Sequence, residues 1–476
     1  MTSTTLRTTA TRLSAPVLTR PGLATVLLGA ALAPIDLFIV NVALPTIGTD
    51  LRTGTSTLEW IVAGYGIAFA LLLVVGGRLG DAFGRRRLFT TGLGAFTLTS
   101  LICGLAPNAT VLVAARVAQG AAAALMVPQV FSIIQATTSG ERRARVLGYY
   151  GATGGISMVI GQLLGGVLVS ANLAGAGWRP IFLVNVPIGL LGMALAHRTL
   201  PETRARNPLG VDRWGTALLG VTLLTLLVPV MEGRAIGWPA WCWVSLAVVP
   251  VAAAAFFAVE RRLERRGGTP LLPASLLGMP SMRYGLAIAM PFFAGFGGFM
   301  FVYALTLQDG LRLGPLASGL ALTPMAVAYL VTALLSSRLV ARHGRRVVVA
   351  GALTQLLGLL LVIGAVLLAW PHVDVLSLAP GTMVAGAGQG LVAPTVFRLV
   401  LSQVPTDRAG AGSGVLATTQ QTSLALGVAT LGTLFATLSA PGGLGFQYAV
   451  AITTAVQAML AAGIALVARR LPDPRD

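Results

Sequence analysis

The chain has 476 residues, of which 55% are hydrophobic and 10% are charged, and its formal net charge is +18. Soluble domains carry about a quarter charged residues, so this composition excludes an ordinary soluble enzyme and predicts an all-α membrane protein that crosses the bilayer many times. So basic a balance would suggest nucleic acid as the partner of a soluble protein. Here the arginines are sorted by loop, so we expect contact with membrane lipid and no nucleic acid.

Apolar runs of about seventeen residues or more predict fourteen transmembrane helices. The runs lie near residues 23–46, 58–75, 88–105, 111–134, 147–171, 180–196, 216–231, 241–259, 284–307, 316–336, 347–370, 375–401, 414–438 and 446–468. With both termini in the cytoplasm, 28 of the 33 basic residues, all arginine, fall in cytoplasmic segments and four fall in outer loops. We therefore expect a multi-pass protein of the inner (plasma) membrane, with residues 1–22 and 471–476 as cytoplasmic tails.

The first predicted helix holds Asp36, which lies about 20 Å into a hydrocarbon core of about 30 Å if the span begins near Leu23. The other acidic residues are expected in loops, at span ends or in the tail. A charge at this depth costs a few kcal/mol unless it is paired, hydrated or protonated, which favours a proton or cation site over a tolerated polar residue beside Pro34. Asn41 lies about 140° further around the helix. We therefore expect Asp36 to face the substrate cavity and Asn41 to make an interhelical hydrogen bond.

Glu59 lies at the start of the second helix, and we place it near the surface, at the outer mouth of the cavity, where it would recruit cations. The basic turn after this helix is interpreted as a conformational switch. A carboxylate there can meet arginines or a helix N-terminus in one transport state and release them in the other. The residues assigned to the switch are Gly77, Asp81, Gly84, Arg85 and Arg86.

The fourth helix carries Arg116, the only arginine deep in a span, and Gln119 and Gly120 share its face of the helix. An arginine does not titrate usefully, so it would tune a carboxylate or orient bound groups; a purely structural ion pair is the alternative. In the fifth helix, the spacing of three glycines predicts close helix packing, with glycine-rich packing of no special role as the alternative. They are Gly161, Gly165 and Gly166.

The ninth helix is rich in phenylalanine, and an aromatic lining suits a hydrophobic ligand. We assign to the substrate cavity Asp36, Glu59, Gln119, Phe292, Phe296, Phe299 and Tyr303. Packing of the aromatic residues against lipid explains them almost as well.

An internal repeat is indicated by two basic turns, because Gly84-Arg85-Arg86 matches Gly344-Arg345-Arg346. Ala341 stands opposite Asp81, so we expect a strong switch in the first half and a weak one in the second. The repeat predicts six-helix halves at residues 23–200 and 284–470, with residues 201–283 as an inserted helix pair and its cytoplasmic loops. Parallel six-helix repeats around a midplane site are typical of secondary transporters.

Four motifs resemble the fourteen-span drug/proton antiporter branch of the major facilitator superfamily, the EmrB/QacA-like family, over nearly the whole chain. They are Asp36 with Asn41-Val42-Ala43-Leu44-Pro45, the turn from Gly77 to Arg86, Arg116 with Gln119 and Gly120, and the run from Trp178 to Gly189. The resemblance implies the major facilitator fold and a role for Arg116 in proton coupling. The sequence departs from the family pattern at Phe38, where a hydroxyl residue is usual, and at Gln162, where proline is usual.

We therefore predict a proton-coupled antiporter, and not an enzyme, that exports a lipophilic drug or antibiotic, neutral or monocationic, by alternating access. Asp36 and Arg116 would couple the protons, and the proton gradient would supply the energy without a cofactor. No metal site is predicted, because Cys103 and Cys242 lack ligand spacing, and we expect a monomer. An uptake symporter and a non-transporting sensor of the same fold are the alternatives.

Overall fold

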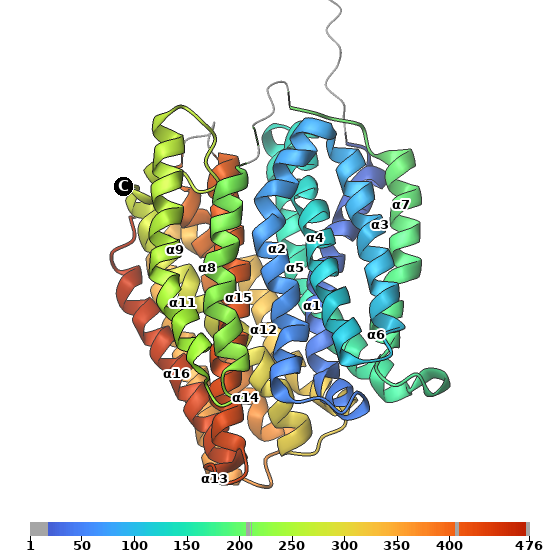
Figure 1. The fold of residues 1–476 in the computed structure, drawn as a ribbon, viewed down its shortest axis with the longest axis vertical. Coiled ribbons are helices and arrows are strands. Elements are labelled where there is room, and N and C mark those ends of the chain that lie inside the picture. Colours follow the sequence, from blue (N-terminus) through green and yellow to red (C-terminus); the bar gives the residue numbers. More distant parts are fainter. Residues whose placement is uncertain (1–17, 206–209, 211, 405–408, 473–476) are drawn as a thin grey trace, which may run out of the picture.

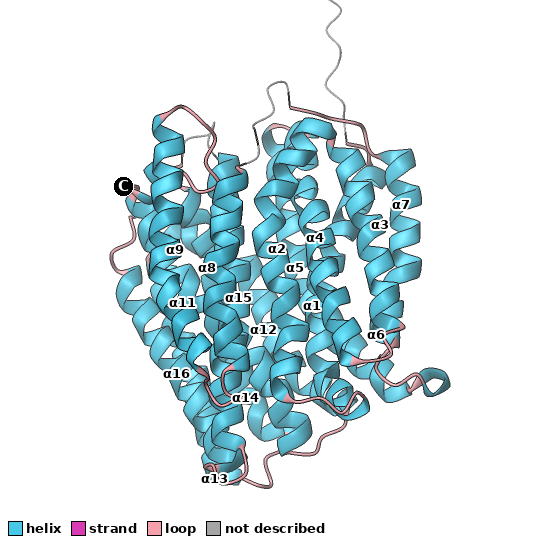
Figure 2. Cartoon of the chain, viewed as in Figure 1, coloured by secondary structure: helices cyan, strands magenta, loops and turns pink. Residues whose placement is uncertain are grey.

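The computed structural model describes residues 18–205, 210, 212–404 and 409–472, and all regular structure within them is helical (Figure 2). In this part of the chain, thirteen helices are long and apolar enough to cross a membrane. A further helix of span length, α3 (Arg85–Gly104), is less apolar but packs among them against α4 and α7. The predicted all-α membrane fold is confirmed. The predicted tails fall largely outside the described residues.

The N-terminal half has six spans, and the last of them is broken into two helices. They are α1 (Arg20–Asp50), α2 (Thr55–Phe83), α3, α4 (Ala109–Thr137), α5 (Gly140–Ala171), and α6 (Pro180–Leu183) with α7 (Asn185–Thr199). Local sequence signals fix where these helices begin. At the start of α4, for example, the side chain of Asn108 accepts a hydrogen bond from the backbone N–H of Val111 at 2.9 Å.

The C-terminal half also has six spans, and an inserted helix pair stands between the halves. The inserted pair is α8 (Arg213–Glu232) and α9 (Ala240–Arg265), followed by the short α10 (Ala274–Leu277). The C-terminal spans are α11 (Pro280–Leu305) with its π-helical end Thr306–Gly310, α12 (Pro315–His343), α13 (Arg346–Ala369), α14 (Val375–Leu401), α15 (Ala409–Ser439) and α16 (Gly445–Ala468). Figure 1 shows the two halves side by side, with α8 and α9 in front.

Both halves use the same pattern of helix packing. Helix α2 packs on α4, α3 on α4, and α1 on α5, as α12 packs on α14, α13 on α14, and α11 on α15. A Cβ atom on Gly120 would lie 2.2 Å from the carbonyl oxygen of Tyr65, so α4 and α2 touch backbone to backbone there. The corresponding glycine, Gly386, would meet the carbonyl oxygen of Met325 at the same 2.2 Å. The predicted repeat is therefore visible in the packing.

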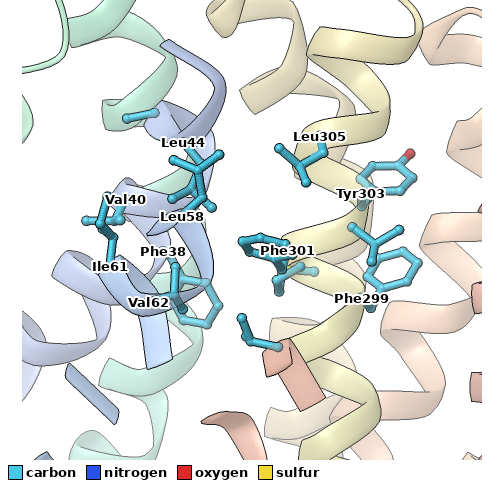
Figure 3. Packing of buried hydrophobic residues seen from close by; sticks show 14 of the residues in the cluster. Phe38, Val40, Leu44, Leu58, Ile61, Val62, Phe299, Phe301, Tyr303 and Leu305 are labelled. Carbon is cyan, nitrogen blue, oxygen red and sulfur yellow. The ribbon is translucent and has the colours of Figure 1, made fainter. Parts of the chain in front are cut away.

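The halves meet where α2 contacts α15, where α5 contacts α12, and where α1 contacts α11. Helix α8 packs against both α2 and α15, so the inserted pair covers one of these seams. Near the end of the bundle that carries Asp50, the gap between α1 and α11 is filled by apolar side chains, including Phe38, Leu44, Phe301 and Leu305 (Figure 3). The amide of Gln308 adds a hydrogen bond between the halves, to the Val42 carbonyl at 2.7 Å.

Candidate functional site

Asp36 lies in the middle of α1 and is fully buried inside the N-terminal half. Arg116 Nη1 donates to Asp36 Oδ2 at 2.5 Å, and both side chains are 0% exposed. The other oxygen, Oδ1, accepts from Gln119 Nε2 at 2.9 Å and from Asn185 Nδ2 at 3.0 Å. Donors from α4 and α7 therefore contact both oxygens of the carboxylate.

The guanidinium of Arg116 is also held by groups other than Asp36. Its Nε donates to the carbonyl of Ile61 on α2 at 2.9 Å, and Nη1 also donates to Gln119 Oε1 at 2.6 Å. Its centre lies 4.4 Å from the centroid of the Tyr65 ring. A buried ion pair recovers its desolvation cost only when the remaining polar atoms are also satisfied. Most polar atoms of Asp36 and Arg116 are hydrogen-bonded. The exception is Arg116 Nη2, which has no hydrogen-bond partner among the described residues.

The network also reaches α3 through Ser100. Gln119 Nε2 donates to Ser100 Oγ at 2.8 Å, and Asn185 Nδ2 lies 3.4 Å from the same atom. The sequence did not single out Ser100 or Asn185 as site residues. Asn185 could have been suspected, because it is the polar residue inside the Trp178–Gly189 motif.

The Trp178–Gly189 motif contacts α1 at a second place. Trp178 Nε1 and Arg179 Nη1 donate to Asp50 Oδ2 at 2.8 and 2.9 Å. The motif therefore binds the end of α1 through Asp50 and its middle through the bond from Asn185 to Asp36. This arrangement gives a physical reason for the spacing of polar residues in the motif.

A small pocket lies between the two halves, and Asp36 does not line it. Its lining residues are Leu37, Phe38, Asn41, Val62, Gly66, Phe296, Gly297, Met300, Gln421, Leu424, Ala425 and Val428. The bonds between helices that were expected of Asn41 are made by Asp36. Asn41 faces the pocket, and its Nδ2 donates to the carbonyl of Leu37 on its own helix at 2.9 Å, so the predicted interhelical bond is wrong. Gln119 lies with Asp36 and not in the pocket.

The volume of this pocket is about 20 Å³, which is room for about one water molecule. A drug-sized ligand needs roughly 300 to 1,000 Å³. The two halves therefore leave too little space in this pocket for a molecule of that size.

The aromatic residues of α11 point in different directions, and of the four assigned to the cavity one lines this pocket. Phe296 lines the pocket and packs edge-on against Phe38, with ring centroids 6.0 Å apart. Phe299 and Tyr303 stack on each other at 5.0 Å on the side of α11 that faces away from α1 (Figure 3). Phe292 is buried within the C-terminal half. These three residues belong to the core.

Glu59 is 1% exposed, so the prediction of a surface position is wrong. Thr433 Oγ1 lies 3.4 and 3.5 Å from its two carboxylate oxygens, at the seam between α2 and α15. Glu59 does not line the pocket. Glu260 of α9 is also fully buried, so Asp36 is not the only acidic residue without access to water.

The predicted switch contains two ion pairs. Arg85 donates to Asp81 Oδ1 through Nη2 at 2.8 Å and through Nε at 3.0 Å, and Arg86 Nε lies 3.6 Å from Glu202 Oε2. Between α2 and α3, Gly84 adopts a φ of 109°, which side chains rarely allow. A Cβ atom on Gly77 would lie 3.7 Å from the Cβ atom of Pro128, which is an ordinary contact.

Arg78, which the sequence did not single out, ties the switch to the inserted helix pair. It donates to three backbone carbonyls, those of Gly210 at 2.6 Å, Thr269 at 2.8 Å and Pro270 at 2.6 Å. These carbonyls lie in the loops that flank α8 and α9. The inserted pair is therefore attached to the end of α2 beside Asp81.

The glycines of α5 lie at two helix contacts. A Cβ atom on Gly161 or Gly165 would meet a backbone oxygen of α1 at 2.9 Å, and one on Gly166 would meet the Pro315 oxygen of α12 at 3.0 Å. Helix α5 thus packs closely on its own half and on the partner half. Beside these glycines, the amide of Gln162 is buried 3.7 Å from the sulfur of Met300, which lines the pocket.

The profile described as Major Facilitator Superfamily matches the chain over residues 26–428 and 285–476. The chain is 39% identical over 418 residues to a protein of Streptomyces coelicolor named "Probable actinorhodin transporter", covering 86% of this chain and 71% of that protein. It is 36% identical to a cephamycin export protein of Amycolatopsis lactamdurans, covering 90% and 88%. It is 33% identical to a puromycin resistance protein of Streptomyces alboniger, covering 87% and 81%.

Solved structures share the fold. A crystal structure of a POT family transporter with 5-aminolevulinic acid superposes with a TM-score of 0.69 at 15% identity, covering 95% of this chain and 98% of that chain. Another, with a thioalcohol-conjugated peptide, gives a TM-score of 0.68 at 14% identity, covering 94% and 95%.

Proposed function

The chain belongs to the major facilitator superfamily and to its drug-exporter branch, and on this premise we propose that it exports lipophilic small molecules across the inner membrane in exchange for protons. The observation that carries the proposal is the ion pair of Asp36 and Arg116, fully buried inside the N-terminal half. A charged carboxylate at this depth is costly, and a structure that served packing alone could use apolar residues there.

Protonation of Asp36 would change the attachment of α1 to α4. The charged carboxylate accepts from Arg116, Gln119 and Asn185. The protonated acid carries no charge to pair with Arg116, so this attachment weakens. If the pair opens only partly, Arg116 stays buried without its counter-charge, and such an intermediate is unfavourable. We therefore expect the pair to be either closed or fully opened to water, as in a two-state equilibrium.

The substrate would bind on the opposite face of α1 from the proton. Phe38 and Asn41 face the pocket between the halves while Asp36 faces away from it. Movement of α1 relative to α4 would therefore change the shape of the pocket without direct contact between proton and substrate. This differs from a scheme in which one carboxylate exchanges the proton for the substrate.

The lining of the pocket suggests the substrate class. None of the described residues that line it is charged, and its polar side chains are the amides of Asn41 and Gln421. Such a surface suits an apolar molecule with a few hydrogen-bonding groups. The names of the relatives, which refer to export and resistance, favour outward transport of antibiotic-like compounds.

The proposal is tested with the purified chain in proteoliposomes that have an acidic lumen and contain a pH-sensitive dye. Ethidium and puromycin, added outside, should each be accumulated and should each raise the lumenal pH. Asp36→Asn should abolish the pH change. A lumen that loses no protons while substrate accumulates would exclude antiport, and protons that move in the same direction as substrate would indicate a symporter.

A further inference from the structure

The two basic turns that mark the repeat differ in how their arginines are neutralised. In the first half, Arg85 is paired with Asp81 at 2.8 Å, and Arg86 lies 3.6 Å from Glu202. In the second half, Ala341 occupies the position that corresponds to Asp81. Arg85 and Arg86 of the first basic turn are therefore neutralised by acidic residues of their own half.

Among the described residues, Arg345 and Arg346 of the second turn are not paired with a carboxylate in this way. Arg345 Nη1 donates to the carbonyl of Leu471 at 2.8 Å, which fixes the chain after α16 against the start of α13. Arg346 and Arg469 are exposed. Within the described part of the chain, no ion pair joins a carboxylate to any of these three arginines.

These arginines form the rim of an open pocket of about 410 Å³ between the start of α13 and the end of α16. Its lining residues are Arg345, Arg346, Val349, Ala350, Leu353 and Arg469. The aliphatic members follow Arg346 at helical spacing, so they form one strip that runs from the helix end into the span. The pocket thus has a cationic end at the start of α13 and an apolar wall along the helix.

We propose that this pocket binds an anionic phospholipid, with the phosphodiester of the headgroup on the arginines and an acyl chain along Val349 and Leu353. Arginine binds phosphate oxygens through two parallel N–H bonds, and basic pockets between helices on the cytoplasmic side suit anionic headgroups. Inorganic phosphate is also an anion, but it has no acyl chain that could contact the apolar wall. The site lies away from the pocket between the halves, so the proposal does not depend on what the protein exports.

The arginines of the first half that correspond to Arg345 and Arg346 are already paired, Arg85 with Asp81 and Arg86 with Glu202, so the first half does not offer an equivalent pair of arginines. An anionic lipid would therefore bind the C-terminal half specifically, where it would join α13 to α16. It would supply from the membrane the negative charge that acidic side chains supply in the first half.

The test is native mass spectrometry of the full chain in detergent, titrated with phosphatidylglycerol or with phosphatidylcholine of the same chain length. The variant is Arg346→Gln with Arg469→Gln, which keeps Arg345 and its bond to Leu471. Each arginine near a membrane surface contributes about a fivefold preference for anionic lipid, so the variant should bind phosphatidylglycerol at least tenfold more weakly. The variant should bind phosphatidylcholine as the wild type does. Its melting temperature in the presence of phosphatidylcholine should also equal that of the wild type.

A matched control is Arg261→Gln with Arg265→Gln, which removes the same charge from exposed positions on α9. This control should retain the binding of phosphatidylglycerol. An equal loss in both variants would reduce the effect to general charge attraction and overturn the proposal. Displacement of phosphatidylglycerol by inorganic phosphate at equal concentration would also overturn it, because the apolar wall would then contribute nothing.

Discussion

Asp36 and Asn41 lie five residues apart on α1 and face opposite sides of the helix, Asp36 toward Arg116 inside the N-terminal half and Asn41 into the pocket between the halves. The group proposed to carry the proton and the groups proposed to contact the substrate are thus separated by the width of one helix. A change on one side can reach the other only through movement of α1. The first two predictions follow from this separation.

Asp36→Asn should stop proton-coupled export and also lower stability. The amide keeps the shape of the side chain, but it leaves the charge of Arg116 buried without a counter-ion, which costs about 3 to 5 kcal/mol. The double variant Asp36→Asn with Arg116→Gln should recover most of this stability, because it buries no charge. It should still not transport protons. Melting temperature in detergent and the lumenal pH assay measure the two effects separately.

Three outcomes would contradict this prediction. Full wild-type resistance of Asp36→Asn at equal expression would show that the carboxylate is not needed for coupling. Restored proton release in the double variant would show the same. A double variant as unstable as the single one would show that the lost stability does not come from an unpaired Arg116.

Phe296→Leu should alter substrate preference with little effect on coupling, because its ring lines the pocket and contacts Phe38. The matched control is Phe292→Leu, four residues earlier on the same helix but buried in the C-terminal half. The control should cost about 1 to 3 kcal/mol of stability and leave the order of preferred substrates unchanged. Relative KM values for ethidium and puromycin test this contrast, and identical profiles in both variants would remove Phe296 from the site.

Asp81→Ala should slow turnover several-fold without weakening substrate binding. Its side chain is 33% exposed, and a pair of this kind with Arg85 contributes about 0 to 1 kcal/mol to stability, so the melting temperature should change little. Ala341→Asp places a carboxylate at the position of the second half that corresponds to Asp81. It tests whether turnover depends on having this carboxylate in the first half alone. A loss of substrate affinity parallel to the loss of rate would contradict the assignment to a switch.

Much of the fold could be predicted from the sequence, because the bilayer imposes one rule on every span. A helix must be long and apolar, and arginine marks the cytoplasmic ends. The predicted spans therefore agree with the helices that the structure describes. Even α3, which is less apolar than the others, was recognised because Arg85 and the next loop bound it.

The site was predicted less well. Helical spacing gives the angle between two side chains on one helix, but it does not show which neighbouring helix either side chain faces. The angle between Asp36 and Asn41 separated them correctly, yet nothing in α1 alone indicates which face meets α4. That direction is set by partners far along the chain, such as Asn185. Glu59 was misplaced for a similar reason, since Thr433, which lies beside it, comes from the other half.

The last prediction concerns the charge of the substrate. The described residues that line the pocket carry no charge, and Asp36 is already paired with Arg116. A divalent cation entering this pocket would lose its hydration with no carboxylate to replace it, whereas a neutral or singly charged lipophilic molecule loses much less. Lipophilic dications should therefore be poor substrates.

Asn41→Asp places a carboxylate in the pocket with almost no change of shape. It should increase efflux of a divalent quaternary ammonium compound more than that of a monovalent one of similar lipophilicity. Glu59→Gln is the control, because Glu59 lies outside the pocket beside Thr433; it should leave the ratio of divalent to monovalent efflux unchanged. Efficient efflux of the divalent compound by the wild type and by Glu59→Gln would show that the charge of the lining does not set the substrate class.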